Sequence, residues 1–92
     1  MAKLIRVNGN VEDVQPKNGK DFDLSELTAA IGCEWIELVN LSNGIMVIDE
    51  EGKLNGKEYN AKATAMCDED HAIMVGDYIV GDALVCKNDE IR

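Results

Sequence analysis

The chain has little of several residue types: one histidine, one proline, three cysteines and four aromatic side chains among 92 residues. The cysteine count is odd and no C-x-x-C spacing occurs. We therefore expect no disulfide scaffold and a protein that resides in a reducing compartment. No apolar run approaches the ~20 residues of a membrane span, and the first residues, MAKLIRVNG, lack the apolar segment of a signal peptide. These absences predict a soluble, cytoplasmic protein.

Basic side chains are missing from residues 21–52, which carry eight acidic ones. Over the whole chain, 18 acidic and 9 basic residues give a formal net charge of −9. Such a field repels nucleic acid and anionic lipid, so neither is expected as a partner, whereas a basic protein surface is attracted. The alternative is that the acidity only confers solubility. The oligomeric state is not predicted.

Length and composition indicate a single domain spanning residues 1–92. With 46% hydrophobic residues, a chain of this size can bury a modest core without disulfides or metals.

Residues 34–52, EWIELVNLSNGIMVIDEEG, hold the single tryptophan and the densest run of large apolar residues. They predict two strands joined at Asn43-Gly44, because both residues accept the positive φ of a type I′ turn. A two-residue loop there would pair Val39 with Ile48. Both faces of these strands are apolar, so the strands are expected to be central, and either covered on both sides or curled into a barrel.

Residues 24–31 predict a short helix. Asp23 is a good N-cap and Glu26 stands three residues later, as in a capping box. Gly32 supplies a left-handed end. A helix of two turns cannot stand alone, so it is expected to dock on the sheet.

The remaining predicted elements have weaker signals. Asn8-Gly9 predicts a hairpin that would pair Ile5 with Glu12, and Asn60 is a potential cap for a second helix. The other predicted segments are a helix at 61–67, a loop at 67–71, and strands near 72–75, 78–80 and 83–87. The predicted fold is α+β: a small, curved, mostly antiparallel sheet of five to seven short strands with a short helix at about 24–31 and a weak one at about 61–67.

Three runs of the sequence resemble a known family: LIRVNGNVEDVQPKNGKDF, IMVIDEEGKLNGKEYNAKAT and IMVGDYIVGDALVC. The chain is similar over most of its length to a family of small domains of unknown function found in phages, mobile elements and gut Firmicutes. The most specific part runs from Val47 to Thr64 and on into the Val-Gly-Asp segment. Family members often have Leu-Pro-x-Asn where this chain has Lys57-Glu58-Tyr59-Asn60. The resemblance implies a small cytoplasmic protein of phage or mobile-element origin, and it implies no activity or ligand.

Motifs for catalysis or metal binding fail on spacing. Cys67 and His71 form C-x3-H but lack two further ligands for zinc. An EF-hand loop beginning at Asp49 needs glycine and glutamate where Leu54 and Asn60 stand. We therefore predict no catalytic residue, no metal and no cofactor, and expect that the protein is not an enzyme.

One basic segment lies between the acidic blocks. Its side chains could bind a nucleotide-like anion, with lysines on phosphate, a tyrosine stacked on a base and a helix N-terminus nearby. The alternative is a solvated loop whose lysines neutralise neighbouring carboxylates. The candidate ligand-binding residues are Lys53, Lys57, Tyr59, Asn60, Lys62 and Thr64.

The leading functional hypothesis is a non-catalytic protein-interaction module for a basic host protein. The predicted register brings Glu37 opposite Glu50, and directly opposed like charges destabilise a sheet. Trp35 is expected to pack in the core, with an exposed interface role as the alternative. The candidate protein-interaction residues are Glu34, Glu37, Asp49, Glu50 and Glu51.

Overall fold

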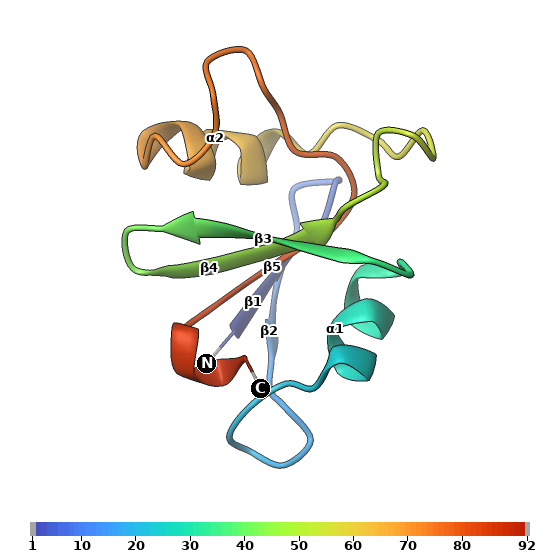
Figure 1. Cartoon of the computed structure of the whole chain (residues 1–92), viewed down its shortest axis with the longest axis vertical. Helices are drawn as coiled ribbons and strands as arrows, with labels where there is room; N and C mark the ends of the chain where they lie inside the picture. Colours follow the sequence, from blue (N-terminus) through green and yellow to red (C-terminus); the bar gives the residue numbers. More distant parts are fainter. Residues whose placement is uncertain (1, 92) are drawn as a thin grey trace.

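Five antiparallel strands form one open sheet in the order β2-β1-β5-β4-β3 in the computed structural model, which describes residues 2–91 (Figure 1). The strands are β1 (Ala2–Ile5), β2 (Val11–Val14), β3 (Ile36–Leu41), β4 (Gly44–Asp49) and β5 (Ala83–Cys86). The helices are α1 (Leu24–Ile31), α2 (Ala61–Glu69) and a 3-10 turn, η1 (Asn88–Glu90). The predicted α+β class and strand number are confirmed.

Each face of the sheet buries its own apolar cluster. Successive side chains of a strand point to opposite faces, so Met46 and Val47 are both fully buried, but in different clusters. On one side α1 contributes Leu27 and Ile31, and on the other α2 contributes Ala63 (Figure 1). The central position and two-sided cover predicted for the β3–β4 hairpin are confirmed for β4. They are wrong for β3, which is an edge strand in which only Val39 is buried.

Helix α1 forms where local signals place it, over Leu24–Ile31. The Asp23 side chain accepts from the Glu26 N–H at 2.9 Å, and the Glu26 side chain accepts from the Asp23 N–H at 3.3 Å. Gly32 ends the helix at φ 75°, with its N–H donating to the Thr28 carbonyl. The capping box and the left-handed end are both confirmed.

The β3–β4 hairpin forms with a register two residues away from the predicted one. Leu41 pairs with Gly44 and Val39 with Met46, so the loop is Ser42-Asn43. Gly44 belongs to β4, where a Cβ would come within 2.4 Å of the Cys86 carbonyl oxygen. Glycine is needed at position 44 because the backbone passes this close to the end of β5, and not because the turn requires a positive φ. A two-residue shift keeps every side chain on its predicted face.

The predicted pairing of Glu37 with Glu50 and the expected core position of Trp35 are both wrong. Glu37 pairs with Ile48, so it does not oppose Glu50. Trp35 precedes β3, packs against neither core cluster and is 60% exposed. Its carbonyl accepts from the Glu50 N–H at 3.0 Å, which continues the ladder past the end of β3.

The β1–β2 hairpin also forms, one residue away from the predicted pairing. Ile5 pairs with Val11 and Leu4 with Glu12. The Arg6 N–H donates to the Asn10 carbonyl at 2.9 Å and encloses a three-residue loop that ends in Gly9, at φ 93°. A three-residue loop with a left-handed glycine is the next commonest hairpin after the two-residue type, and it shifts the register.

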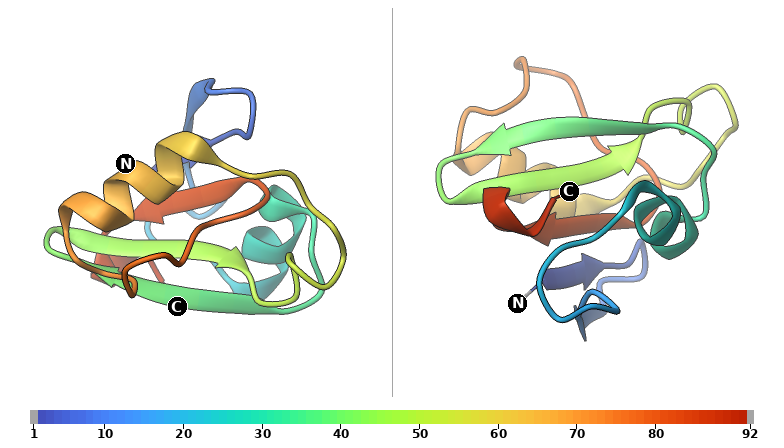
Figure 2. Two further views of the ribbon diagram at one scale, coloured as in Figure 1. Left: turned by 90° about the horizontal axis from the view of Figure 1, so that it is seen from above. Right: turned by 60° about the horizontal axis from the view of Figure 1, so that its bottom comes forward.

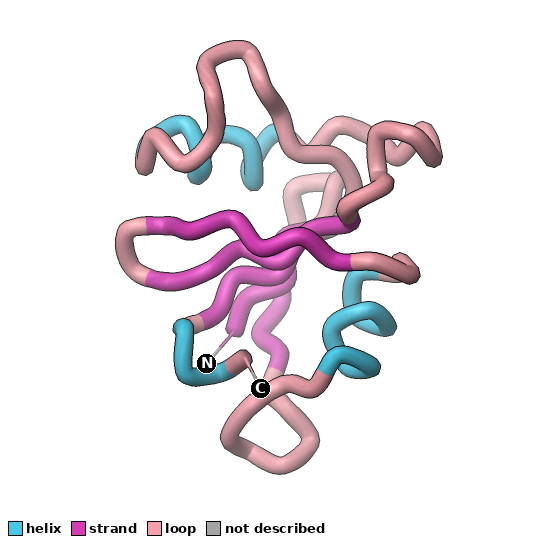
Figure 3. Tube along the Cα trace, viewed as in Figure 1, coloured by secondary structure: helices cyan, strands magenta, loops and turns pink. Residues whose placement is uncertain are grey.

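The second half of the chain departs further from prediction. Helix α2 runs to Glu69, so Asp68 and Glu69 lie in its last turn, not in a loop. The two carboxylates are unfavourable beside the negative end of the helix dipole, but the cost is small because both are exposed to solvent. The predicted strands near 72–75 and 78–80 are a loop with one isolated bridge at Val80, whereas β5 is confirmed (Figure 3).

Removing the α1 cap should destabilise the protein. We expect Asp23→Ala to lower the free energy of unfolding by about 1–2 kcal/mol, because the Glu26 N–H loses its acceptor. Ser25→Ala is the control, since it changes an exposed residue in the same helix to a better helix former. Urea denaturation of both variants tests this, and equal midpoints would contradict the role of the cap.

Candidate functional site

An open cleft of about 610 Å³ lies where the end of α1 faces the end of β4. Exposed Glu34 and Glu51 line it together with buried Asp49. We call it the acidic cleft. Its lining residues are Thr28, Ala29, Gly32, Cys33, Glu34, Asp49, Glu51, Asn55 and Lys57.

An ion pair between Asp49 and Lys57 links the elements that line the acidic cleft. The Asp49 side chain is 3% exposed, and its Oδ1 accepts from the Glu51 N–H at 2.8 Å. Its Oδ2 lies 2.8 Å from the Lys57 ammonium in an ion pair and, within residues 2–91, receives no well-aligned hydrogen bond. The same ammonium donates to the Gly32 carbonyl at 3.0 Å. One lysine thus joins the end of α1 to the end of β4.

The five predicted interaction residues share one end of the β3–β4 hairpin, where they line two separate hollows. Glu34 and Glu51 line the acidic cleft. Glu37 and Glu50 border a separate hollow of about 140 Å³. Asp49 lines both and is buried, so it supports the surface without presenting a charge to a partner.

Trp35 lies between these two pairs of glutamates. It follows Glu34 in the chain, and its backbone pairs with that of Glu50. Sequence reasoning assigned it to the core because a single tryptophan beside an apolar strand usually packs there. Trp35 follows Glu34 directly and, two residues before Glu37, shares a strand face with it. These acidic neighbours were the feature of the sequence that could have indicated a charged, solvent-facing position.

The six predicted ligand-binding residues do not converge on one pocket. Lys53 pairs with Asp77, and its ammonium lies 4.4 Å from the centre of the Tyr78 ring. That hydrogen bond raises the pKa of Lys53 and lowers the pKa of Asp77. Tyr59 packs against Tyr78, with ring centroids 6.1 Å apart. Lys62 is exposed elsewhere, on α2.

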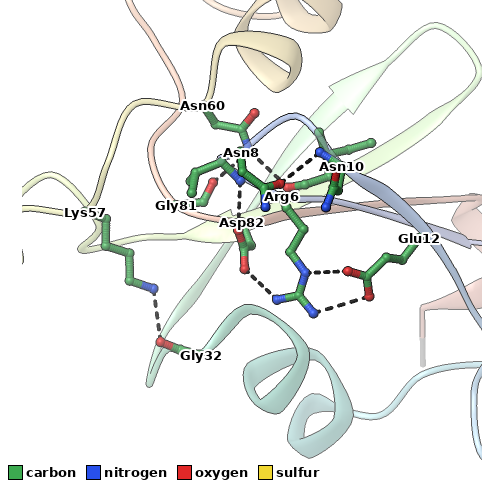
Figure 4. Close-up of polar contacts among 11 residues, drawn as sticks. Arg6, Asn8, Asn10, Glu12, Gly32, Lys57, Asn60, Gly81 and Asp82 are labelled. Atoms are coloured by element: carbon green, nitrogen blue, oxygen red, sulfur yellow. Dashed lines mark hydrogen bonds and ion pairs between the residues drawn. The ribbon is translucent and has the colours of Figure 1, made fainter.

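Asn60 and Thr64 are structural. Asn60 is fully buried, and its amide donates to the carbonyls of Ile5 and Gly81 at 3.0 and 2.9 Å (Figure 4). Its Oδ1 accepts from the Ala63 N–H at 3.0 Å and caps α2. The Thr64 hydroxyl accepts from a backbone N–H, that of residue 79, at 2.8 Å.

An ionic cluster borders this polar centre. The Arg6 guanidinium donates to Asp82 at 2.9 Å and to Glu12 at 2.9 and 3.3 Å (Figure 4). The hydrogen bond to Glu12 and, to a smaller extent, that to Asp82 raise the pKa of Arg6. The bond from Arg6 in turn lowers the pKa of Glu12. Asp82 also accepts from the Val7 N–H at 3.0 Å. Gly81 has φ 76°, and a Cβ there would meet the Lys57 side chain at 2.8 Å.

The sequence runs that carry the family resemblance therefore meet in space, around Asn60. Comparison with known families also finds a family of small domains: a family model described as a domain of unknown function (DUF3846) matches residues 4–91. The chain belongs to this family. No curated protein and no solved structure matches it.

Several polar residues of this DUF3846 domain serve its fold. Asn60, Thr64 and Asp82 each satisfy backbone groups of another segment. Gly52 lies so close to the Val80 side chain that a Cβ would meet it at 2.8 Å. These residues therefore serve the fold of this chain and do not by themselves indicate a chemical activity.

The cysteines of the DUF3846 domain are all free in the structure. Burial raises the pKa of Cys67 and of Cys86 to about 11, and it also raises that of the half-buried Cys33. The Cys67 thiol lies 3.6 Å from the Met46 sulfur, inside the core. His71 is exposed. Within residues 2–91, no cluster of three metal-ligating side chains occurs, and neither helix could cross a bilayer.

Replacing the Asn60 amide by a carboxylate removes its two donated hydrogen bonds and keeps the accepted one, so it tests the contribution of the donated pair alone. Asn60→Asp keeps the acceptor for the Ala63 N–H but turns an oxygen toward the carbonyls of Ile5 and Gly81. We expect a loss of at least about 3 kcal/mol in the free energy of unfolding. Asn43→Asp makes the same chemical change in the exposed hairpin loop and should stay within about 0.5 kcal/mol. Equal denaturation curves for the two variants would refute the structural role.

The pKa of Asp77 should report its bond with Lys53. In the folded protein this pKa lies below the ordinary value of 3.8, first because of Lys53 and then because of the Tyr78 N–H. Stability from the pair is therefore present above pH 3.8 and is lost as the pH falls through the folded pKa. In Lys53→Gln, carboxyl NMR titration should show the Asp77 midpoint higher than in the parent. The Asp70 midpoint, lowered by Ser42, is the internal control, and an unmoved Asp77 would contradict the pair.

Proposed function

We propose that this DUF3846 domain is a non-catalytic interaction module that binds a basic protein partner. The binding surface is the acidic hairpin end, defined as exposed Trp35 with Glu34, Glu37, Glu50 and Glu51. The observation that carries the proposal is Trp35, the only tryptophan, which is 60% exposed among carboxylates.

The charges of the acidic hairpin end are not neutralised from within. None of the ion pairs among residues 2–91 involves one of these four glutamates. The nearest lysines in sequence, Lys53 and Lys57, pair instead with Asp77 and Asp49. Glu34, Glu50 and Glu51 are thus available to an external cation, whereas Glu37 also interacts with Lys53 and, after Asp77, helps to raise the pKa of that lysine.

Arginine is the side chain that best fits this surface. Its planar guanidinium forms two parallel hydrogen bonds with a carboxylate and also stacks on an aromatic face. Tryptophan is enriched among the residues that dominate binding energy at protein interfaces. An arginine that stacks on Trp35 could reach glutamates on either side.

The resemblance supplies the biological setting of the proposal. A small cytoplasmic protein of phage or mobile-element origin would meet basic host proteins, which include those that bind nucleic acid. Its net charge of −9 disfavours direct binding to nucleic acid or to an anionic membrane. The alternative of a nucleotide-like anion bound at residues 53–64 is not favoured, because Asn60 and Thr64 are buried and two of the three lysines are in ion pairs.

The proposal is tested by capturing host proteins at low salt and measuring association of the purified partner. Glu34→Gln with Glu50→Gln should slow association about tenfold, and the difference should shrink as salt rises. Trp35→Ala should weaken binding by at least about thirtyfold through faster dissociation. Both variants should keep the parent melting temperature, because the altered side chains are exposed.

A matched control removes two charges elsewhere. Asp68→Asn with Glu69→Gln changes exposed carboxylates at the end of α2 and alters net charge equally. It should leave association close to the parent rate. If both double variants slow association alike, only net charge matters, and the acidic hairpin end is not the binding surface.

A further inference from the structure

The outer edge of β3 offers unpaired backbone groups. β3 is the last strand of the sheet, with no strand beside its outer edge (Figure 2). The Trp35 carbonyl bonds to the Glu50 N–H, and alternate residues of an antiparallel strand bond to the same neighbour. Odd-numbered residues of β3 therefore bond to β4. The N–H and C=O groups of Ile36, Leu38 and Asn40 point outward, and no hydrogen bond within residues 2–91 reaches them.

The opposite edge of the sheet is protected in ways that β3 is not. β2 has four residues, and its two central ones, Glu12 and Asp13, are charged and pair with Arg6 and Lys3. Charged, short edge strands resist pairing with another chain. β3 has six residues, of which only Glu37 is charged. The edge open to strand addition is therefore the one next to the acidic hairpin end.

The side chains of β3 differ between its two faces. Leu38 pairs with Val47 on the face covered by α1, and it is 45% exposed. Glu37 pairs with Ile48 on the face covered by α2, and it is exposed. A strand added beside β3 would thus meet an apolar side chain on one face and a carboxylate on the other.

We infer that the basic partner binds by adding an extended segment to the edge of β3, with apolar and basic residues alternating along it. The inference rests on the proposed function and adds the mode of recognition. Main-chain hydrogen bonds to Ile36, Leu38 and Asn40 supply affinity, and alternate side chains supply specificity. Apolar residues of the segment contact Leu38, and basic ones contact Glu37 and the neighbouring glutamates.

Charge argues that the added strand comes from a partner and not from a second copy. Two copies would bring together chains of net charge −9 each. They would also place two Glu37 side chains and their neighbouring glutamates on one continuous sheet, where like charges repel. A basic segment removes both penalties.

A random dodecapeptide display library, selected against the full chain, tests the inference. Selected peptides should alternate arginine or lysine with apolar residues. Binding should fall at least tenfold in Asn40→Pro relative to Asn40→Ala, because proline removes the outward N–H and blocks the approaching backbone. Asn40 is exposed and at the edge, where proline is tolerated in a strand.

Methylation of the peptide provides a measurement that does not depend on the folding of a variant. N-methyl groups on one alternate set of peptide amides should abolish binding, whereas those on the other set should not. Equal binding by Asn40→Pro and Asn40→Ala, with no such alternation, would overturn strand addition and leave the basic-partner function standing. Selected peptides without basic residues, or no selected peptides, would overturn the basic segment itself. A dimer in sedimentation that Asn40→Pro dissolves would assign the edge to a second copy.

Discussion

The buried side chain of Asn60 is the interaction on which the arrangement of layers depends. Its three hydrogen bonds join the end of β1, Gly81 two residues before β5, and the start of α2. Each bond satisfies a backbone group, so its loss would leave a buried donor or acceptor without a partner, which costs more than an ordinary hydrogen bond contributes. The helix over one face of the sheet is thereby fixed to two central strands by a single amide.

Local signals predicted the elements, and long-range contacts decided what the signals could not. Helix α1 could be predicted to the residue because Asp23, Glu26 and Gly32 act within one or two turns. The hairpin register could not be predicted in this way, because Gly44 packs against the carbonyl of Cys86, which is 42 residues away in the chain. The apolar run before β5 looked like strands, but the backbone N–H of Ile79 bonds to the Thr64 hydroxyl.

The candidate site shows the same division. The acidic block at residues 21–52 correctly indicated a concentration of carboxylates at one end of the hairpin. The sequence did not indicate that Asp49 is buried against Lys57, since this depends on how the end of α1 and residue 57 pack against the end of β4. In the basic segment, Asn60 and Thr64 are buried and Lys53 and Lys57 form ion pairs, so four of its six candidate residues take part in contacts within the fold.

Lys57 couples three positions that are distant in the chain. Its aliphatic part occupies the space beside Gly81 where a Cβ would lie, and its ammonium compensates the buried charge of Asp49. A side chain at position 81 would be strained at a φ of 76° and would also displace the Lys57 side chain. A displaced or shorter residue at 57 leaves the carboxylate at 49 uncompensated. These three positions therefore cannot vary independently during evolution. Across the family, substitutions at 49, 57 and 81 should be correlated, although no two of them are neighbours in sequence.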